Sequence, residues 1–202
     1  MWLMIAITVI VGYLLGNING AICASKALGD DVRTHGSGNA GLTNFIRSYG
    51  ASRSLLVILI DALKAVAACV LGGLLLREHL GFQDGSILGG TAAMLGHVFP
   101  VFFNFRGGKG ILSGLFVALV TDYRVALIIL AVFMVAYLTT WYVSLGSVLA
   151  SLAFGVAFVL LHYNDPVIAV CGVFMCLLAV FMHRQNILRL VKGEERKTNL
   201  FK

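Results

Sequence analysis

Long apolar stretches, each separated from the next by a short polar segment, run along the whole chain. A stretch of about 20 apolar residues is long enough for one α-helix to cross the ~30 Å hydrocarbon core of a membrane. The pattern predicts seven such helices, over residues 2–24, 53–76, 84–103, 108–121, 124–140, 145–162 and 166–182. We therefore expect an all-α, polytopic integral membrane bundle. Because no polar segment is long enough for a separate soluble domain, residues 1–202 are predicted to form one domain.

The composition supports a membrane location. Apolar residues make up 59% of the chain and the mean hydropathy is +0.94, far from the balance of a soluble domain. The four cysteines lie in apolar stretches without metal-binding spacing, so we interpret them as small hydrophobic residues and expect no metal site. Nucleic-acid binding is not expected, because no soluble fold is available to carry it.

Lysine and arginine are concentrated in three polar segments, 25–53, 104–110 and 183–202, which hold twelve of the 15 basic residues. The alternate loops carry only Arg77 and Arg124, and Lys64 lies within a helix. Cytoplasmic loops are enriched in these residues, so the three segments are expected to face the cytoplasm, with the N-terminus outside and the C-terminus inside. The net charge of +6 suits anionic lipid headgroups or anionic substrates.

The first of these segments contains HGSGNAGLTNFIR, residues 35–47. Its glycines prevent a continuous helix and can expose consecutive backbone N–H groups to an anion. Arg47 can fold back as a bidentate clamp for a phosphate or a carboxylate. The other candidate binding residues here are Ser37, Gly38, Asn39, Thr43 and Asn44. The alternative is an interfacial loop that satisfies its own backbone.

The second segment is FRGGKG, residues 105–110, at the start of a predicted helix. It is not a Walker A motif, because Gly110 stands where that motif requires Ser or Thr. Arg106 and Lys109 nevertheless flank glycines at a helix N-terminus, where free N–H groups and the helix dipole favour a phosphate. Gly107, Gly108 and Gly110 are therefore candidate binding residues. The alternative is a positively charged cytoplasmic turn.

The third segment, HRQNILRLVKGEE at residues 183–195, continues from the last predicted helix. In helical form it places His183 and Asn186 on one face, where a histidine can bind a substrate or carry a proton. The alternative for His183 is an interfacial anchor. Glu194 or Glu195 is expected to pair with a basic neighbour and hold the tail in place.

Asp61 and Lys64 are charged residues inside a predicted helix, where a charge needs a partner or a wet cavity. They are expected either to neutralise each other at i, i+3 or to leave Lys64 facing a polar pocket. The three polar segments all bring glycine, cationic and amide groups to one membrane face. Together they predict an anion site for more than one phosphate.

These motifs resemble those of the bacterial acyl-phosphate:glycerol-3-phosphate acyltransferases, an integral membrane family that begins phosphatidic acid synthesis. SGNAGLTNFIR is similar to the family's first motif, GHVFPVFFNFRGGKG to its second and HRQNILRLVKGEE to its third; DALKA, residues 61–65, resembles a further signature. Ala40 departs from the family pattern, which often has proline or serine at this position.

The resemblance implies transfer of a fatty acyl group from acyl phosphate to the 1-hydroxyl of sn-glycerol 3-phosphate, without a cofactor. The products would be lysophosphatidic acid and inorganic phosphate, and another enzyme would supply the acyl phosphate. It implies a bacterial cytoplasmic membrane and a structural role for Glu195 or, second, Glu194. The implied active-site residues are Ser37, Arg47, Lys109, His183 and Asn186, with Gly107, Gly108 and Gly110 shaping the glycerol phosphate site.

The main alternative is a membrane transporter of phosphorylated metabolites, which would also use glycine-broken loops and cations. A transporter should carry polar groups at both membrane faces, and the predicted outer loops 77–83, 122–124 and 163–165 hold few.

Overall fold

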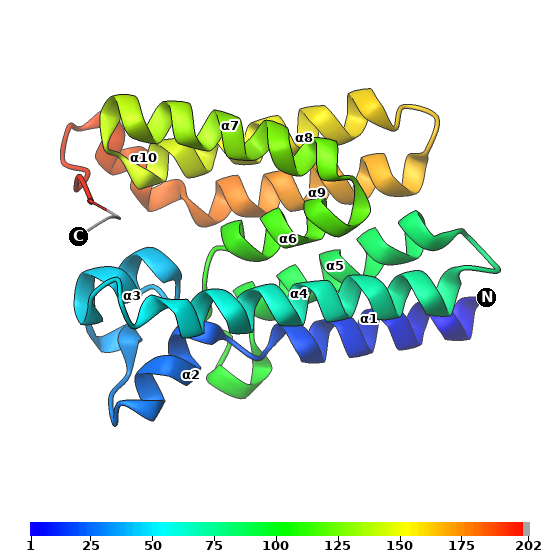
Figure 1. Cartoon of the computed structure of the whole chain (residues 1–202), viewed down its shortest axis with the longest axis horizontal. Coiled ribbons are helices and arrows are strands. Elements are labelled where there is room, and N and C mark those ends of the chain that lie inside the picture. The colour runs from blue at the N-terminus through cyan, green and yellow to red at the C-terminus, as the bar shows by residue number, and fades with distance from the viewer. Residues whose placement is uncertain (200–202) are drawn as a thin grey trace.

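The computed structural model describes residues 1–199. As predicted, all of its regular secondary structure in that range is helical. Figure 1 shows the helices running back and forth along one long axis. The elements are α1 (Trp2–Gly16), α2 (Gly20–Ala27), η1 (Val32–Thr34), α3 (Leu42–Tyr49), α4 (Ser54–Leu76), α5 (Phe82–Val98), η2 (Val101–Phe103), α6 (Ile111–Thr121), α7 (Tyr123–Thr140), α8 (Val143–Leu161), α9 (Pro166–Met182) and α10 (Arg184–Val191). The two η elements are short 3₁₀ helices.

Helix length and hydropathy identify the candidate membrane crossings among residues 1–199. Five segments are long and apolar enough to cross a membrane, and the bent pair α9–α10 makes a sixth. Helix α6 is apolar but has 11 residues, which span about 16 Å, roughly half of the hydrocarbon core. The chain is therefore an integral membrane bundle with five or six full crossings. The predicted seventh crossing depends on α6 and stays a prediction.

The first predicted helix, residues 2–24, is broken in the structure. Helix α1 ends at Gly16 and α2 starts at Gly20. The Asn17 side chain donates to the carbonyl oxygen of Tyr13 at 2.7 Å, and Asn19 caps α2 by accepting from the backbone N–H of Ile22 at 3.0 Å. Asparagine side chains compete with helical backbone bonds in this way. The break lets α2 leave the line of α1 (Figure 1).

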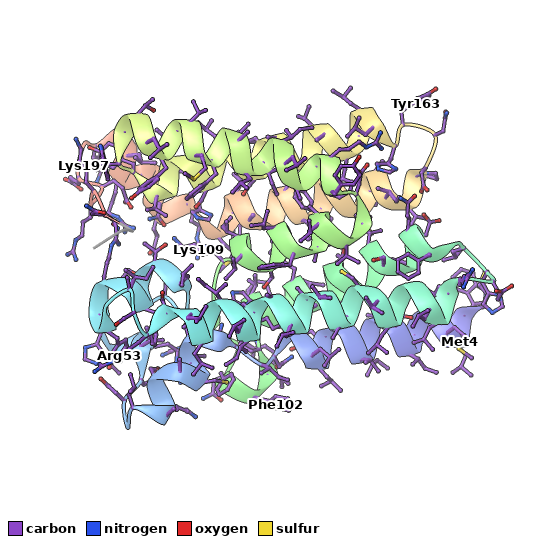
Figure 2. All side chains as sticks on the ribbon, in the orientation of Figure 1. Met4, Arg53, Phe102, Lys109, Tyr163 and Lys197 are labelled. Atoms are coloured by element: carbon purple, nitrogen blue, oxygen red, sulfur yellow. The ribbon has the colours of Figure 1, made fainter. Side chains whose placement is uncertain are left out.

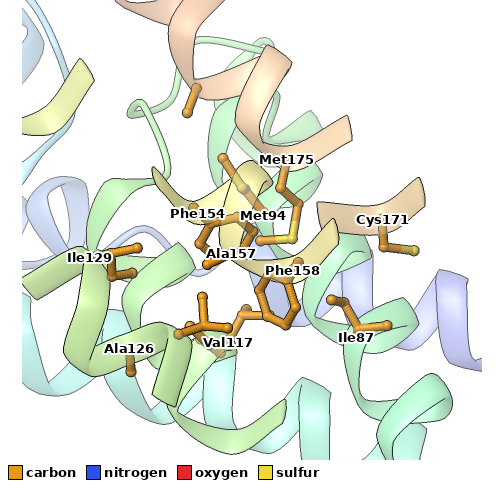
Figure 3. Close-up of a cluster of buried hydrophobic side chains, with 14 of the residues drawn as sticks. Ile87, Met94, Val117, Ala126, Ile129, Phe154, Ala157, Phe158, Cys171 and Met175 are labelled. Atoms are coloured by element: carbon orange, nitrogen blue, oxygen red, sulfur yellow. The ribbon is translucent and has the colours of Figure 1, made fainter. Parts of the chain in front are cut away.

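Helix α6 lies between two groups of helices (Figure 1). Helices α1, α4 and α5 pack together on one side of it, and α7, α8 and α9 on the other. Buried apolar side chains from both groups meet around α6, among them Ile87, Met94, Val117, Phe158 and Met175 (Figure 3). Large apolar side chains also cover the outer faces of the helices, as lipid contact requires.

The two termini lie at opposite ends of the bundle (Figure 1). Figure 2 shows Met4 and Tyr163 toward one end and Arg53 and Lys197 toward the other. The first and third basic segments of the sequence therefore share one end, while Lys109 of the second lies deeper in the bundle.

Candidate active site

A cavity of about 400 Å³ lies among α3, α4, the N-terminus of α6, α7, α8 and α10. Its polar wall includes Ser37, Asn39, Thr43, Asn44, Arg47, Asp61, His97, Lys109, His183, Asn186 and Glu195. Its apolar wall includes Ile58, Leu112, Leu115, Ile129, Leu130 and Phe133. One cavity is thus lined by both charged and apolar side chains.

Asn44 organises the glycine-rich segment before α3. Its Nδ2 donates to the carbonyl oxygens of Val32 and His35, both at 3.0 Å. Its Oδ1 accepts from the backbone N–H of Ser37 at 2.9 Å. Gly36 has φ +58° and lies so close to the Asn44 amide that a Cβ would collide with it. Asn44 therefore satisfies the backbone of this loop, as the alternative interpretation expected, while Ser37 lines the cavity.

Lys109, Asn186, Glu195 and Arg189 form a continuous polar chain. Lys109 Nζ donates to Asn186 Oδ1, and Asn186 Nδ2 donates to Glu195 Oε1 at 2.9 Å. The second carboxylate oxygen of Glu195 accepts from Arg189 Nε at 2.8 Å. The prediction that a glutamate after Gly193 pairs with a basic neighbour is confirmed for Glu195.

Two cations of the polar wall, Lys109 and Arg47, form no salt bridge with any residue of the range 1–199. Burial lowers the pKa of Lys109 to about 8, although the Glu195 carboxylate acts to raise it; Arg189 and Arg47 lower it further. Burial also lowers the pKa of Arg47. Partly dehydrated positive groups of this kind attract an anion more strongly than exposed ones do.

His183 lies where α9 meets α10 and is 3% exposed. Its Nδ1 is 2.8 Å from the carbonyl oxygen of Ala179. A carbonyl oxygen can only accept, so Nδ1 carries the proton and Nε2 of the neutral ring carries a lone pair. Within residues 1–199, Nε2 has no hydrogen-bond partner. It can therefore accept a hydrogen bond or a proton from a substrate hydroxyl.

Arg47 lines the cavity, but the C-terminal tail holds one edge of its guanidinium. Nε donates to Thr198 Oγ1 at 2.8 Å, and Nη2 donates to the same oxygen and to the carbonyl oxygen of Arg196, the latter at 3.2 Å. Nη1 has no hydrogen-bond partner in the described part of the chain. The expected phosphate clamp is thus half engaged by the protein itself.

Asp61, Lys64 and His97 form a buried cluster. Lys64 Nζ lies 2.8 Å from Asp61 Oδ1 and 2.7 Å from His97 Nδ1. It also donates to the carbonyl oxygens of Gly16 and Ile18, at 3.2 and 2.9 Å, and so ties α4 to the break between α1 and α2. The expectation that Asp61 and Lys64 neutralise each other is confirmed. Asp61 and His97 line the cavity, whereas Lys64 is not among its lining residues.

Most of the predicted site residues lie in this one cavity: Ser37, Asn39, Thr43, Asn44, Arg47, Lys109, Gly110, His183 and Asn186. Four do not line it: Gly38, Arg106, Gly107 and Gly108. The Arg106 side chain is exposed. Gly108 donates its N–H to the carbonyl oxygen of His97 at 3.1 Å, and a Cβ there would lie 2.7 Å from the carbonyl oxygen of Ala40. Its contribution is close packing beneath Lys109.

Among the residues that sequence reasoning missed are His97, which lines the cavity, and Thr198, which contacts Arg47. His97 falls inside the second motif, where a histidine at the junction of an apolar helix and a polar loop was a usable signal. Thr198 is an ordinary residue of a polar tail, and nothing in the sequence marks it.

Comparisons with known proteins cover nearly the whole chain. Residues 6–193 match the family model described as glycerol-3-phosphate acyltransferase. A glycerol-3-phosphate acyltransferase of Thermoanaerobacter sp. (strain X514) is 39% identical over 195 residues, which are 95% of this chain and 94% of the relative. One from Finegoldia magna is 38% identical over 201 residues, 97% of each chain.

Two solved structures of PlsY, an integral membrane glycerol 3-phosphate acyltransferase, have the same fold. The glycerol 3-phosphate form has a TM-score of 0.88 and 32% identity, covering 98% of this chain and 99% of that one. The lysophosphatidic acid form has a TM-score of 0.84 and 32% identity, covering 97% and 96%.

Proposed function

The chain belongs to the glycerol-3-phosphate acyltransferase family and acylates glycerol 3-phosphate, and we propose that its acyl donor is an acyl phosphate. The acyl group passes to the sn-1 hydroxyl and gives 1-acyl-sn-glycerol 3-phosphate (lysophosphatidic acid) and inorganic phosphate, the first step of phospholipid biosynthesis. Membership of this family argues against the alternative function, a membrane transporter of phosphorylated metabolites.

The observation that carries this proposal is a pair of helix N-termini, each with its own cation, in one cavity. Leu42 and Thr43 begin α3, which also carries Arg47, while Ile111 and Leu112 begin α6 just after Lys109. Free N–H groups and the helix dipole make such N-termini favourable for phosphate. An acyl phosphate carries its phosphate on the reacting carbonyl, so it needs a second anion position beside that of glycerol 3-phosphate. A thioester has no phosphate there.

The main barrier for this reaction is electrostatic. Two phosphate groups bring about 3–4 negative charges together at neutral pH. Arg47 and Lys109 offset this charge in surroundings where water is partly excluded. The acyl phosphate is already an activated anhydride, so the chain needs to supply orientation and charge rather than a covalent nucleophile. Ser37 and Asn39 act as hydrogen-bond donors to the bound phosphates.

The proton of the attacking hydroxyl needs an acceptor. As the hydroxyl oxygen bonds to the carbonyl carbon, the bond from that carbon to the phosphate oxygen breaks and its electron pair stays with the phosphate. The leaving phosphate thereby becomes more basic and takes the proton. His183 Nε2 accepts the hydrogen bond of the hydroxyl, takes this proton as the new carbon–oxygen bond forms and passes it to the leaving phosphate. The same hydrogen bond holds the hydroxyl oxygen within about 3–3.5 Å of the carbonyl carbon.

The apolar wall of the cavity suits the acyl chain. Leu112 and Leu115 of α6 and Ile129 and Phe133 of α7 line the same cavity as Lys109. The reacting carbonyl would then lie between the polar wall and the apolar wall of the cavity. This arrangement also excludes water from the anhydride.

The bundle would lie in a bacterial cytoplasmic membrane with its basic end inside, its N-terminus outside and α6 completing a seventh passage. The cavity would then receive glycerol 3-phosphate from the cytoplasm. Acyl phosphate would come from an enzyme that makes this anhydride, and lipid surrounds the helices.

The donor can be tested with purified protein in detergent. We expect palmitoyl phosphate and glycerol 3-phosphate to give lysophosphatidate and one equivalent of inorganic phosphate, while palmitoyl-CoA gives no product. Product from palmitoyl-CoA alone would overturn the donor assignment. Arg47→Ala should be inactive with the same melting temperature as the unaltered protein.

A further inference from the structure

The C-terminal tail, residues 194–199, joins the cavity wall through Thr198. Besides the contacts of its hydroxyl oxygen with Arg47, its backbone N–H donates to the carbonyl oxygen of Trp141 at 3.1 Å. Its carbonyl oxygen accepts from the Tyr137 hydroxyl, also at 3.1 Å. Thr198 is 7% exposed. Backbone anchors on α7 thus fix this residue, and its side chain reaches across to α3.

Two residues that precede Thr198 also anchor the tail. Glu195 is bonded to Asn186 and Arg189 of α10. The Lys197 ammonium lies 5.5 Å from the centre of the Tyr142 ring, within the range of a cation–π contact. Figure 2 shows Lys197 at the basic end of the bundle. The tail therefore approaches Arg47 as a fixed element.

Thr198 holds Arg47 without neutralising it. Arg33, Arg124 and Arg189 are each held by a carboxylate, of Asp31, Asp122 and Glu195 respectively. A hydroxyl oxygen and a backbone carbonyl take their place at Arg47. Neutral acceptors fix the guanidinium plane and leave its charge available, whereas a carboxylate would compete with a phosphate.

We propose that Thr198 is a positioning residue for the phosphate-binding Arg47. It takes the Nε and Nη2 edge of the guanidinium and turns the Nη1 edge toward the bound phosphate. This inference rests on the proposed function, because it takes Arg47 to bind a phosphate. The opposite relationship, in which the tail blocks Arg47 until a substrate displaces it, would use the same contacts, but it gives no role to the unpaired Nη1.

The test compares Thr198→Val with Thr198→Ser. Valine keeps the shape of the side chain and both backbone anchors but removes the hydroxyl. We expect kcat/KM for the substrate whose phosphate binds Arg47 to fall about tenfold to hundredfold. Serine should restore most of the loss. In an Arg47→Lys background the same Thr198→Val change should have little further effect, because lysine has no Nε–Nη2 edge. Thr139→Val, on the exposed face of α7 where the hydroxyl bonds within its own helix, is the matched control.

Three results would overturn the proposal: full activity in Thr198→Val, higher activity in Thr198→Val, or a serine variant no better than the valine variant. Higher activity would identify the contact as inhibitory. If Thr198→Val melts at a much lower temperature, Thr198→Ala removes the hydroxyl with less change in bulk. The role of Thr198 can also be tested separately from the donor. If palmitoyl phosphate fails as a donor, calorimetry can still measure the binding of glycerol 3-phosphate to the same variants.

Discussion

The ammonium group of Lys109 donates to the side-chain oxygen of Asn186, so the loop before α6 is tied to α10 across the cavity. Asn186 presents its oxygen to Lys109 because its amide nitrogen is committed to Glu195. The Glu195 carboxylate therefore fixes the orientation of an amide and, through it, the position of a cation. Charge state and geometry at Lys109 are coupled by this arrangement.

The pH dependence of catalysis should report Lys109. Its pKa is lowered to about 8, so its ammonium loses the proton at a lower pH than an exposed lysine does. Phosphate binding needs the protonated form, and kcat/KM for glycerol 3-phosphate should accordingly fall as the pH rises through about 8. Lys109→Arg keeps its charge, and the fall should move to a higher pH. A pH–rate profile of each protein measures this; identical alkaline limbs would contradict it.

Glu195→Gln provides a second check on the same group. The Glu195 carboxylate raises the pKa of Lys109, so its neutral replacement should shift the alkaline fall in kcat/KM to lower pH.

The same variant should change the pH dependence of stability. Burial raises the pKa of Glu195, but hydrogen bonds from Arg189 and Asn186 outweigh this effect and the net shift of the pKa is downward. Its stabilising effect is therefore present near neutral pH and is lost as the pH falls through the lowered pKa. The difference in melting temperature between the two proteins should disappear in acid.

Apolar length and local capping determine most of the fold, and both are visible in the sequence. Helix α9 spans the predicted residues 166–182, with Pro166 in its first turn and Asp165 accepting from the backbone N–H groups of Val167 and Ile168. Residues 2–24 differ because the break after Gly16 has two contributions: Asn17 and Asn19 bond to the local backbone, and Lys64 reaches the carbonyl oxygens of Gly16 and Ile18 from α4. The sequence shows the first contribution but not the second. A contact between distant helices leaves no mark on the local pattern.

Some residues of the candidate site could likewise be identified from the sequence, and others could not. Arg47, Lys109 and His183 carry charge or a titratable ring in segments that are otherwise glycine-rich or apolar, so their chemistry identifies them. Arg106 has the same chemistry as Arg47 but is exposed and does not line the cavity. The sequence shows which residues are cationic, whereas the folded structure is needed to show which of them line the cavity.

His183→Ala should lower kcat for acyl transfer by about 10²-fold or more and change KM for glycerol 3-phosphate little. The Nε2 lone pair acts on the hydroxyl during the reaction, so its loss falls on the chemical step. His35→Ala is the control, because His35 is partly exposed and pairs with Asp30 outside the cavity. Steady-state kinetics on both variants decide the question; an effect confined to KM would contradict the assignment.

Gly108→Ala should impair turnover through the loop that carries Lys109. A Cβ there would collide with Nε2 of His97 and lie 2.7 Å from the carbonyl oxygen of Ala40, so the loop or His97 would have to move. Because Lys109 is the next residue, we expect such a shift to displace it. Gly114→Ala is a matched control in α6, because the added Cβ would have no atom within 4 Å apart from its chain neighbours and the backbone of its own helix. Alanine within a helix is favoured over glycine by about 0.5–1 kcal/mol. We expect the control to be active and slightly more heat-stable.

Lys64→Met should destabilise the bundle by about 3–5 kcal/mol, because it leaves the Asp61 carboxylate buried without its cation. Both side chains are 2% exposed and their charged atoms are 2.8 Å apart, so the two charges are buried as a pair. Adding Asp61→Asn removes the orphaned charge and keeps an acceptor for the backbone N–H of Gly20, which now donates to Asp61 at 3.1 Å. The double variant should therefore melt at a higher temperature than Lys64→Met alone. Thermal unfolding in one detergent compares all three proteins; a single variant as stable as the unaltered chain would show that the pair does not hold α4 against the α1–α2 break.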